Sequence, residues 1–235
     1  MNLSHRLVLD TTFNTRELGG IPLNNQQVVK WQQLLRSDDV SFLSEVDIAS
    51  IKKYGINTVI DLRTEQERRE TGYTLTEDKE IVKHYISLMI SDNVMDITQA
   101  ETEMTLGSFY CKLLDESKEQ FKEIFEVFAS DESKGVLFHC AAGKDRTGVV
   151  AALMLNLLGA NEADIIANYE VTYSYLSANP KFEAPDMYRH LINSDREHMI
   201  IFLDKLNKEY GNAEEYLKNC GVSVEKINNL KEKYR

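Results

Sequence analysis

The 235-residue sequence has few of the features that mark disulfide-rich, disordered or membrane-spanning chains. It contains three cysteines, an odd number that suits free thiols in a reducing compartment. It contains only three prolines, and 43% of its residues are apolar, which is the composition of an ordered globular protein. The apolar runs, such as 149–155 and 199–203, are far shorter than the ~20 residues that cross a bilayer. We therefore expect a folded chain without integral membrane association.

Positive charge is also scarce. The chain has 27 Lys and Arg against 38 Asp and Glu, a formal net charge of −11. Such an excess of negative charge repels nucleic acids and anionic membranes, so we expect no nucleic-acid partner. Residues 1–20 contain only Leu7 to Leu9 as an apolar cluster, which is too short for the apolar region of a signal peptide. The sequence predicts a cytoplasmic protein, which we expect to be a monomer.

The order of apolar and polar segments predicts an α/β fold. Apolar, β-branched runs predict four strands, namely Val28–Leu35, Ile56–Leu62, His84–Ile90 and Gly135–His139. Helical spacing predicts a helix capped by Ser44 and ended by Gly55, one or two helices over 107–129, and a buried helix over 146–158.

In the helix after Ser44, the residues expected on the buried face are Val46, Ile48, Ile51 and Tyr54. The almost wholly polar segment 63–79 is expected to be solvated. We expect a single domain over 1–235. Its α/β core, 1–160, holds a mostly parallel central sheet flanked by helices, and residues 161–235 form a helical C-terminal cap.

The segment HCAAGKDRTG, residues 139–148, carries the most specific pattern in the chain. Cys140 is followed by five residues and then Arg146, in a loop that connects a predicted strand to a predicted helix. Successive backbone N–H groups and a helix N-terminus can surround one anion in such a loop, and Gly143 can adopt positive φ there. The residues expected to bind phosphate are Ala141, Ala142, Gly143, Lys144, Asp145 and Arg146.

The residue types in this loop also suggest a reaction. A cysteine beside a helix N-terminus and an arginine favours the thiolate, so Cys140 is the candidate nucleophile for attack on phosphorus with a phosphocysteine intermediate. Arg146 supplies a planar fork that matches two phosphate oxygens. Thr147 is expected to hydrogen-bond the thiolate when it leaves, and His139 to orient the loop rather than act as a base. The other cysteines lack these neighbours and are expected to be structural, namely Cys111 and Cys220.

This loop resembles the signature of the cysteine-dependent phosphatases, and its form is similar to that of the bacterial tyrosine-phosphatase family, which also acts on phosphoinositides. Further motifs resemble that family as well: NTRELGG at 14–20, Arg36-Ser37, Asp61-Leu62-Arg63 and the closing helices over 210–230. The resemblance implies hydrolysis of phosphomonoesters, in phosphotyrosine proteins and phosphoinositides, without a metal or organic cofactor.

The residue that protonates the leaving group stays open among three aspartates. In the family that the chain resembles, the aspartate of K-D-R has been considered the acid and that of D-L-R a support for the loop, which assigns these roles to Asp145 and Asp61. The alternatives are that Asp145 only caps the following helix, or that Asp92 is the acid. Arg63 is expected to form a structural ion pair with Asp61, and Arg16 to tie down the N-terminal segment.

The role of Lys144 and the reaction itself each have more than one interpretation. Lys144 can contact the second phosphate of a polyphosphorylated substrate, which would favour activity on both phosphotyrosine peptides and phosphoinositides, or it can be a solvated charge. The same loop geometry also serves arsenate reduction or sulfur transfer, each with Cys140 as nucleophile, and a pseudoenzyme that only binds phosphate. Arsenate reduction needs a resolving cysteine nearby, and neither other cysteine is close to Cys140 in the sequence.

Overall fold

The computed structural model describes residues 4–89, 105–179 and 193–235. Within these ranges, short strands form one five-stranded sheet in the order β1-β2-β5-β3-β4. The strands are β1 (Arg16–Glu17), β2 (Leu34–Ser37), β3 (Thr58–Asp61), β4 (Val82–Tyr85) and β5 (Val136–His139). β1 pairs with β2 antiparallel, and the three other pairings are parallel. The predicted α/β class with a mostly parallel sheet is confirmed.

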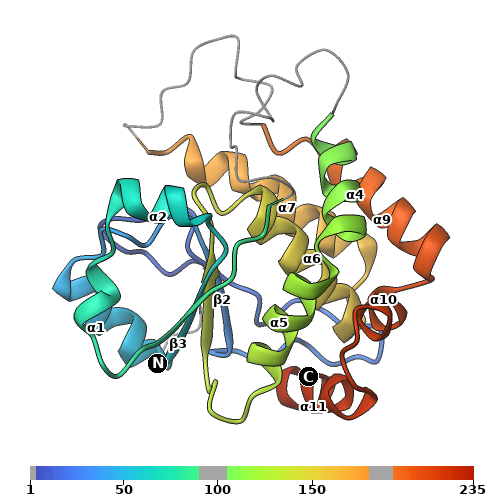
Figure 1. Ribbon diagram of the computed structural model, residues 1–235, viewed down its shortest axis with the longest axis horizontal. Helices are drawn as coiled ribbons and strands as arrows, with labels where there is room; N and C mark the ends of the chain where they lie inside the picture. Colours follow the sequence, from blue (N-terminus) through green and yellow to red (C-terminus); the bar gives the residue numbers. More distant parts are fainter. Residues whose placement is uncertain (1–3, 90–104, 180–192) are drawn as a thin grey trace.

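Both faces of the sheet are covered by helices (Figure 1). One face packs against α1 (Glu45–Tyr54), and α2 (Glu65–Thr71) and the 3-10 turn η1 (Thr74–Glu77) follow on that side. The other face is covered by α4 (Leu106–Glu116), α5 (Lys118–Ala129), α6 (Asp145–Leu158), α7 (Glu162–Leu176), α9 (Arg196–Lys205), the π-helix η3 (Leu206–Tyr210), α10 (Ala213–Asn219) and α11 (Val224–Tyr234). Among the described residues, no helix has the length and apolar character needed to span a bilayer.

Neighbouring residues in the central strands belong to different halves of the core. The α1 side holds Leu35, Val59 and Leu137. The opposite side holds Leu34, Ile60 and Phe138. Because a strand in this position buries both of its faces, it has no polar alternation. This explains why β3 and β5 were predicted from unbroken apolar runs.

The ends of α1 agree with the sequence, and its buried face agrees in part, because Ile51 and Tyr54 are buried as predicted and Ile48 is partly buried. The Ser44 side chain accepts from the backbone N–H of Asp47, and Gly55 ends the helix with φ 114°. Val46, predicted to be buried, is 67% exposed. Asp47 is buried instead, because its carboxylate accepts the backbone N–H of Asp10 at 2.8 Å.

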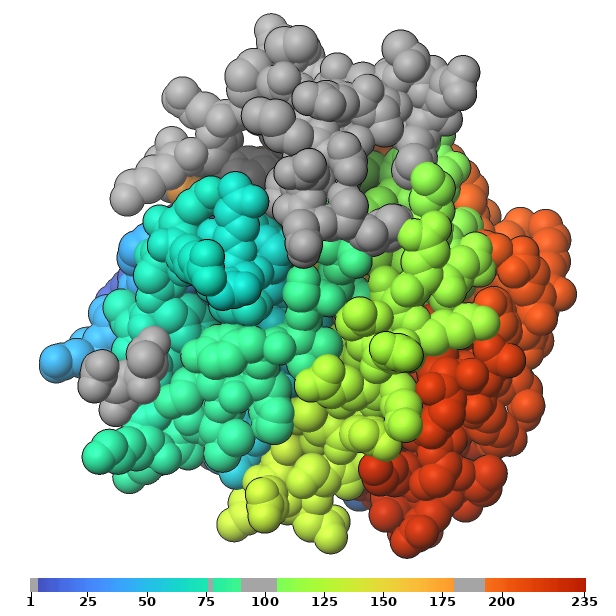
Figure 2. All heavy atoms as spheres, viewed as in Figure 1, coloured from blue at the N-terminus to red at the C-terminus, as the bar shows by residue number. Residues whose placement is uncertain are grey.

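Several strand and helix boundaries differ from the predictions. β2 begins at Leu34, and β4 ends at Tyr85 instead of beginning at His84 and running on to residue 90. β4 is an edge strand of the sheet, and Val82 and Tyr85 are about half exposed, so its sequence gives a weak apolar signal. The segment around β4, teal-green in Figure 2, lies on the surface of this face. The segment 107–129 is two helices, because α4 ends at Glu116 and α5 begins at Lys118, with Ser117 between them.

Candidate active site

The carboxyl ends of β2, β3 and β5 lie at the same edge of the sheet, the upper edge in Figure 1. The strand register places Ser37 and Asp61 on either side of His139, the last residue of β5. After His139 the chain forms the loop 140–144 and enters α6 at Asp145, one residue before the predicted start. In open parallel sheets this edge is where ligands bind.

The outer side of this loop is held by groups from remote parts of the chain. Three of its carbonyl oxygens accept hydrogen bonds from these groups: Ala141 from the Asp39 N–H at 2.9 Å, Ala142 from Asn14 Nδ2 at 2.9 Å, and Gly143 from Arg36 Nη2 at 2.8 Å. In a trans peptide unit the N–H points away from the C=O. The N–H groups of residues 142–144 therefore point to the inner side of the loop, where they can meet an anion.

Gly143 allows the loop to approach β2 closely. Its φ is +65°, as the sequence analysis predicted. A Cβ at this position would lie 2.3 Å from the carbonyl oxygen of Ser37, a distance that no side chain tolerates. The loop therefore requires glycine here for both its backbone conformation and its packing.

Cys140 is buried at the start of the loop, with 2% of its surface exposed. Two guanidinium groups, those of Arg36 and Arg146, lie close enough to Cys140 that a thiolate there would raise the pKa of each. Burial lowers the pKa of Arg36 to about 10, and the charge at Cys140 opposes that shift. The Thr147 hydroxyl is buried and has no hydrogen-bond partner within the described residues, so its predicted bond to the sulfur is not formed in this structure.

The Arg146 guanidinium is held by a carboxylate that the sequence analysis did not select. Glu67 of α2 accepts from Arg146 Nη1 at 2.6 Å and from Nη2 at 2.7 Å. Burial alone would raise the pKa of Glu67, but Arg146 and the N–H of Thr64 hold it below its usual value. The prediction of a wholly solvated segment 63–79 is wrong, because Arg63 is buried and Glu67 joins the site.

Asp61 and His139 form a buried layer beneath the loop. Asp61 receives two hydrogen bonds from Arg63, at 2.9 and 2.7 Å, which is the predicted ion pair. Burial opposes ionisation of Asp61, but the hydrogen bonds and positive charge of Arg63 hold its pKa below the usual value. Burial lowers the pKa of His139, which leaves the ring neutral. Its Nδ1 lies 3.1 Å from the Cys140 carbonyl oxygen, so Nδ1 carries the proton and Nε2 accepts from the Tyr73 hydroxyl at 3.0 Å.

Asp145 and Lys144 lie between the loop and the helices. The Asp145 side chain is 28% exposed and accepts a hydrogen bond from the Tyr110 hydroxyl of α4. The interpretation of Lys144 as a solvated charge is wrong: the residue is 2% exposed. Its ammonium donates to the Asn193 carbonyl oxygen at 3.2 Å and lies 3.4 Å from Asp145 Oδ1.

The remaining candidates lie farther from the loop or outside the described residues. Arg16 ties the N-terminal segment to α7 through the Asn168 carbonyl oxygen and the Thr172 hydroxyl, at 2.7 and 2.8 Å. Burial raises the pKa of both Cys111 and Cys220, which keeps each as a thiol. Asp92, the alternative proton donor, lies outside the described residues.

These features define a class of protein: an α/β chain whose strand–loop–helix unit places a buried cysteine, inward N–H groups and a paired arginine at the carboxyl edge of a parallel sheet. A family model described as "Tyrosine phosphatase family" matches residues 7–235. The chain therefore belongs to the tyrosine phosphatase family.

Individual relatives agree with this assignment. The chain is 34% identical over 214 residues to the tyrosine-protein phosphatase of Nostoc commune, covering 84% of this chain and 72% of that protein. It is 22% identical over 248 residues to the triple specificity protein phosphatase PtpB of Mycobacterium tuberculosis, covering 85% and 89%. The crystal structure of P. aeruginosa TpbA aligns over 86% of this chain and 96% of that chain, at 13% identity and a TM-score of 0.42, an overlap too slight to bear on the site.

Proposed function

We propose that this protein hydrolyses phosphotyrosine in proteins through a phosphocysteine intermediate. The observation that carries the proposal is the position of Cys140: it is buried at the start of a loop with inward N–H groups, and two guanidinium groups lie near enough to stabilise a thiolate there. Membership of the tyrosine phosphatase family supports phosphatase chemistry, and a relative 34% identical over most of the chain bears the name tyrosine-protein phosphatase.

The proposed reaction has two steps. First, the Cys140 thiolate forms an S–P bond while the P–O bond to the leaving group breaks, and the leaving oxygen takes a proton from Asp145. The loop N–H groups and Arg146 stabilise the charge on the other phosphate oxygens. Second, a water molecule attacks phosphorus and gives a proton to the Asp145 carboxylate. The S–P bond then breaks, which releases phosphate and restores the thiolate.

Two observations support Asp145 rather than Asp61 as the proton donor. Asp61 is 1% exposed and paired with Arg63, so it is held as an ion beneath the loop and can neither receive substrate nor readily carry a proton. Asp145 is partly exposed at the start of α6. Its hydrogen bond comes from the side chain of Tyr110, which is not the backbone contact of a residue that only caps a helix.

Thr147, buried without a partner in the described residues, has a hydroxyl free to donate to the departing thiolate.

Phosphoinositide hydrolysis is the second candidate, and it depends on Lys144. A relative named a triple specificity phosphatase supports a broad substrate range. However, the Lys144 ammonium already binds the Asn193 carbonyl oxygen and lies near Asp145, so a second phosphate would have to replace these contacts. Phosphate release from phosphatidylinositol phosphates by the wild type and Lys144→Ala tests this role. A larger loss on the lipids than on a phosphotyrosine peptide supports the role, and equal losses contradict it.

The main test measures phosphate release from a phosphotyrosine peptide by the wild type, Cys140→Ser and Cys111→Ser. We expect Cys140→Ser to be inactive and Cys111→Ser to keep full activity. Acid quenching with a ³²P-labelled peptide should trap label on the wild type and not on Cys140→Ser. Phosphate binding without turnover in the wild type would indicate a binding module. Oxidation of Cys140 coupled to arsenate would indicate a reductase, and persulfide formation at Cys140 from a sulfur donor would indicate a sulfurtransferase.

A further inference from the structure

Two buried tyrosines form a hydrogen-bonded chain that ends on Asp145. The Tyr110 hydroxyl donates to Asp145 Oδ1, and the Tyr169 hydroxyl lies 2.8 Å from the Tyr110 hydroxyl. Tyr110 comes from α4 and Tyr169 from α7, and their solvent exposures are 0% and 1%. The two rings meet edge to face, with centroids 6.0 Å apart. The chain therefore runs from the helical layer to the edge of the phosphate-binding loop.

The direction of these hydrogen bonds follows from counting protons. A phenol has one proton to donate, and that of Tyr110 is committed to Asp145. Tyr169 must therefore donate to the oxygen of Tyr110. Burial raises the pKa of both phenols, so both are protonated at neutral pH.

This arrangement makes the two oxygens of Asp145 unequal. Oδ1 accepts the hydrogen bond from the Tyr110 hydroxyl and lies 3.4 Å from the Lys144 ammonium. Oδ2 makes no hydrogen bond to any of the described residues, so it is the oxygen on which a transferable proton can sit. The fixed contact at Oδ1 restricts rotation of the carboxyl group and determines where Oδ2 points.

We infer that Tyr110 is a positioning residue for the proton donor, with Tyr169 as the second link; this rests on the proposed function, in which Asp145 is the acid. When the P–O bond breaks, the proton on Oδ2 passes to the leaving oxygen and Asp145 becomes a carboxylate. A hydrogen bond to a charged acceptor is stronger than one to a neutral acceptor, so the Tyr110 bond strengthens as the proton leaves. Tyr110 thus assists most where proton transfer is most advanced, which is with poor leaving groups.

The test compares kcat/KM for a series of phosphomonoesters, from 4-nitrophenyl phosphate to alkyl phosphates, because this parameter includes departure of the leaving group. Tyr110→Phe keeps the ring and removes the hydroxyl. We expect it to lower kcat/KM about tenfold for the poor leaving groups and about twofold for 4-nitrophenyl phosphate. Tyr169→Phe should show the same selectivity with a smaller loss. It also serves as a second variant if Tyr110→Phe folds poorly.

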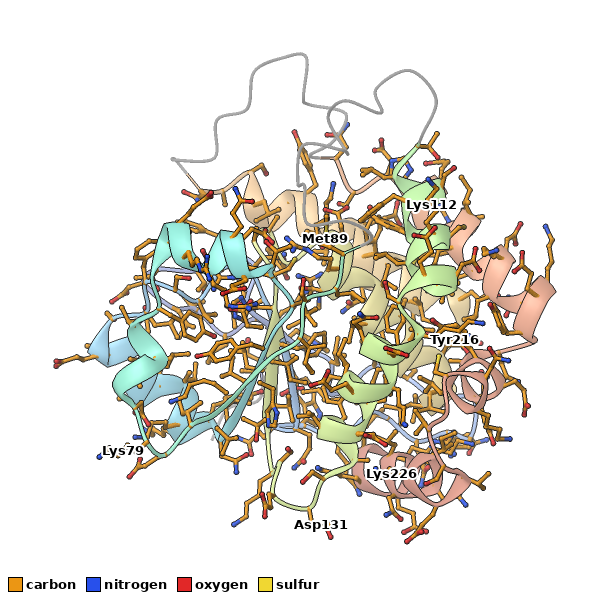
Figure 3. The ribbon with its side chains drawn as sticks, viewed as in Figure 1. Lys79, Met89, Lys112, Asp131, Tyr216 and Lys226 are labelled. Carbon is orange, nitrogen blue, oxygen red and sulfur yellow. The ribbon has the colours of Figure 1, made fainter. Side chains whose placement is uncertain are left out.

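The control is Tyr216→Phe. Tyr216 of α10 is also fully buried, and its hydroxyl donates to the Leu114 carbonyl oxygen of α4 at 2.8 Å. Figure 3 labels Tyr216 at the right of the view, below Lys112 of α4. Tyr216→Phe therefore reports the cost of removing a buried tyrosine hydroxyl that is bonded to α4, the helix that contains Tyr110. Its dependence of rate on leaving group should match that of the wild type.

Asp145→Asn separates failure of this inference from failure of the proposed function. If Asp145→Asn lowers the rate equally for all leaving groups, Asp145 is not the acid and the proposed function loses its proton donor. If Asp145→Asn is selective for poor leaving groups while Tyr110→Phe is uniform, the inference about Tyr110 is overturned. In the double variant we expect no selectivity beyond that of Asp145→Asn alone, and additive losses would also overturn it.

Discussion

At the residue scale, Gly143 is the position where one added carbon has the largest expected effect. Gly143→Ala must place a Cβ 2.3 Å from the Ser37 oxygen and keep φ at +65°. We expect the free energy of unfolding to fall by more than ~3 kcal/mol, measured by urea denaturation.

The control for this variant is Gly211→Ala. Gly211 has φ +84° and nothing within 4 Å of its added Cβ, so it reports the backbone cost alone, about 1–2 kcal/mol. Equal losses in the two variants would mean that the loop moves away from β2 at little cost.

Glu67 gives a second prediction at this scale, because it shares the Arg146 guanidinium with any bound phosphate. Glu67→Gln leaves that guanidinium without its carboxylate, and we expect a loss of about 1–2 kcal/mol of stability in phosphate-free buffer. Phosphate supplies the missing negative charge, so saturating phosphate should raise the unfolding temperature more in Glu67→Gln than in the wild type.

The matched control is Glu65→Gln on the same helix, since within the described ranges Glu65 forms an ion pair with the exposed Arg69 alone. It should respond to phosphate as the wild type does. A smaller phosphate response in Glu67→Gln would instead assign Glu67 to aiming the arginine.

Single residues also show what the sequence could and could not predict about the site. The positive φ of Gly143 could be predicted, because a tight loop between Cys140 and Arg146 favours a residue without a Cβ. Glu67 was not, because its partner Arg146 is 79 positions away and polar residues in 63–79 carry no periodic signal. Lys144 was placed near the mouth of the site, but its burial depends on Asn193, a contact that no local pattern encodes.

At the scale of elements, the N-terminal segment is tied to the loop 140–144 through Asn14. Its amide donates to the carbonyl oxygens of Ala142 and Gly143, at 2.9 and 3.2 Å. Asn14→Ala should lower kcat/KM on 4-nitrophenyl phosphate about tenfold or more, since the inward N–H groups are no longer fixed. Stability should fall by only ~1–2 kcal/mol.

Asn25→Ala, in the exposed turn that follows Pro22, is the comparison variant and should match the wild type in both assays. A loss of stability in Asn14→Ala without a loss of rate would assign the Asn14 contact to folding alone.

A helix or strand could be predicted where particular residue types fix its ends. Ser44 and Gly55 mark α1 because a hydroxyl cap and a left-handed glycine act within one turn of the helix. β1 was missed because it has only two residues, both polar, and forms through pairing with β2. The sheet order has no local signature, since it depends on contacts between strands distant in the chain. The division at residue 160 stays a prediction.

At the scale of the whole molecule, the buried His139 couples stability to pH. Burial lowers its pKa below 6.5, so between that folded value and 6.5 the unfolded chain binds a proton that the folded chain does not. The free energy of unfolding therefore falls as pH is lowered through this window, by at most about 1.4 kcal/mol per pH unit. We expect urea denaturation at pH 7.5, 6.5 and 5.5 to show this extra loss in the wild type and not in His139→Gln.

The difference in pH-dependent stability between the wild type and His139→Gln isolates the contribution of this histidine. Burial raises the pKa of Glu17 and Asp38, which favours the folded state as pH falls and thus acts in the opposite direction, but both chains contain these groups. Parallel loss of stability in the wild type and His139→Gln would mean that the folded protein protonates His139 as readily as the unfolded chain does.

The position of β5 has a consequence for synthesis on the ribosome. β5 lies between β2 and β3 in the sheet, yet it follows β4, α4 and α5 in the chain. Until it emerges from the exit tunnel, the nascent polypeptide has two strands whose inner edges lack their partner, and such edges pair readily with other chains. The strand that closes the gap also leads directly into Cys140. A nascent chain therefore gains Cys140, the proposed nucleophile, together with the strand that covers these two open edges.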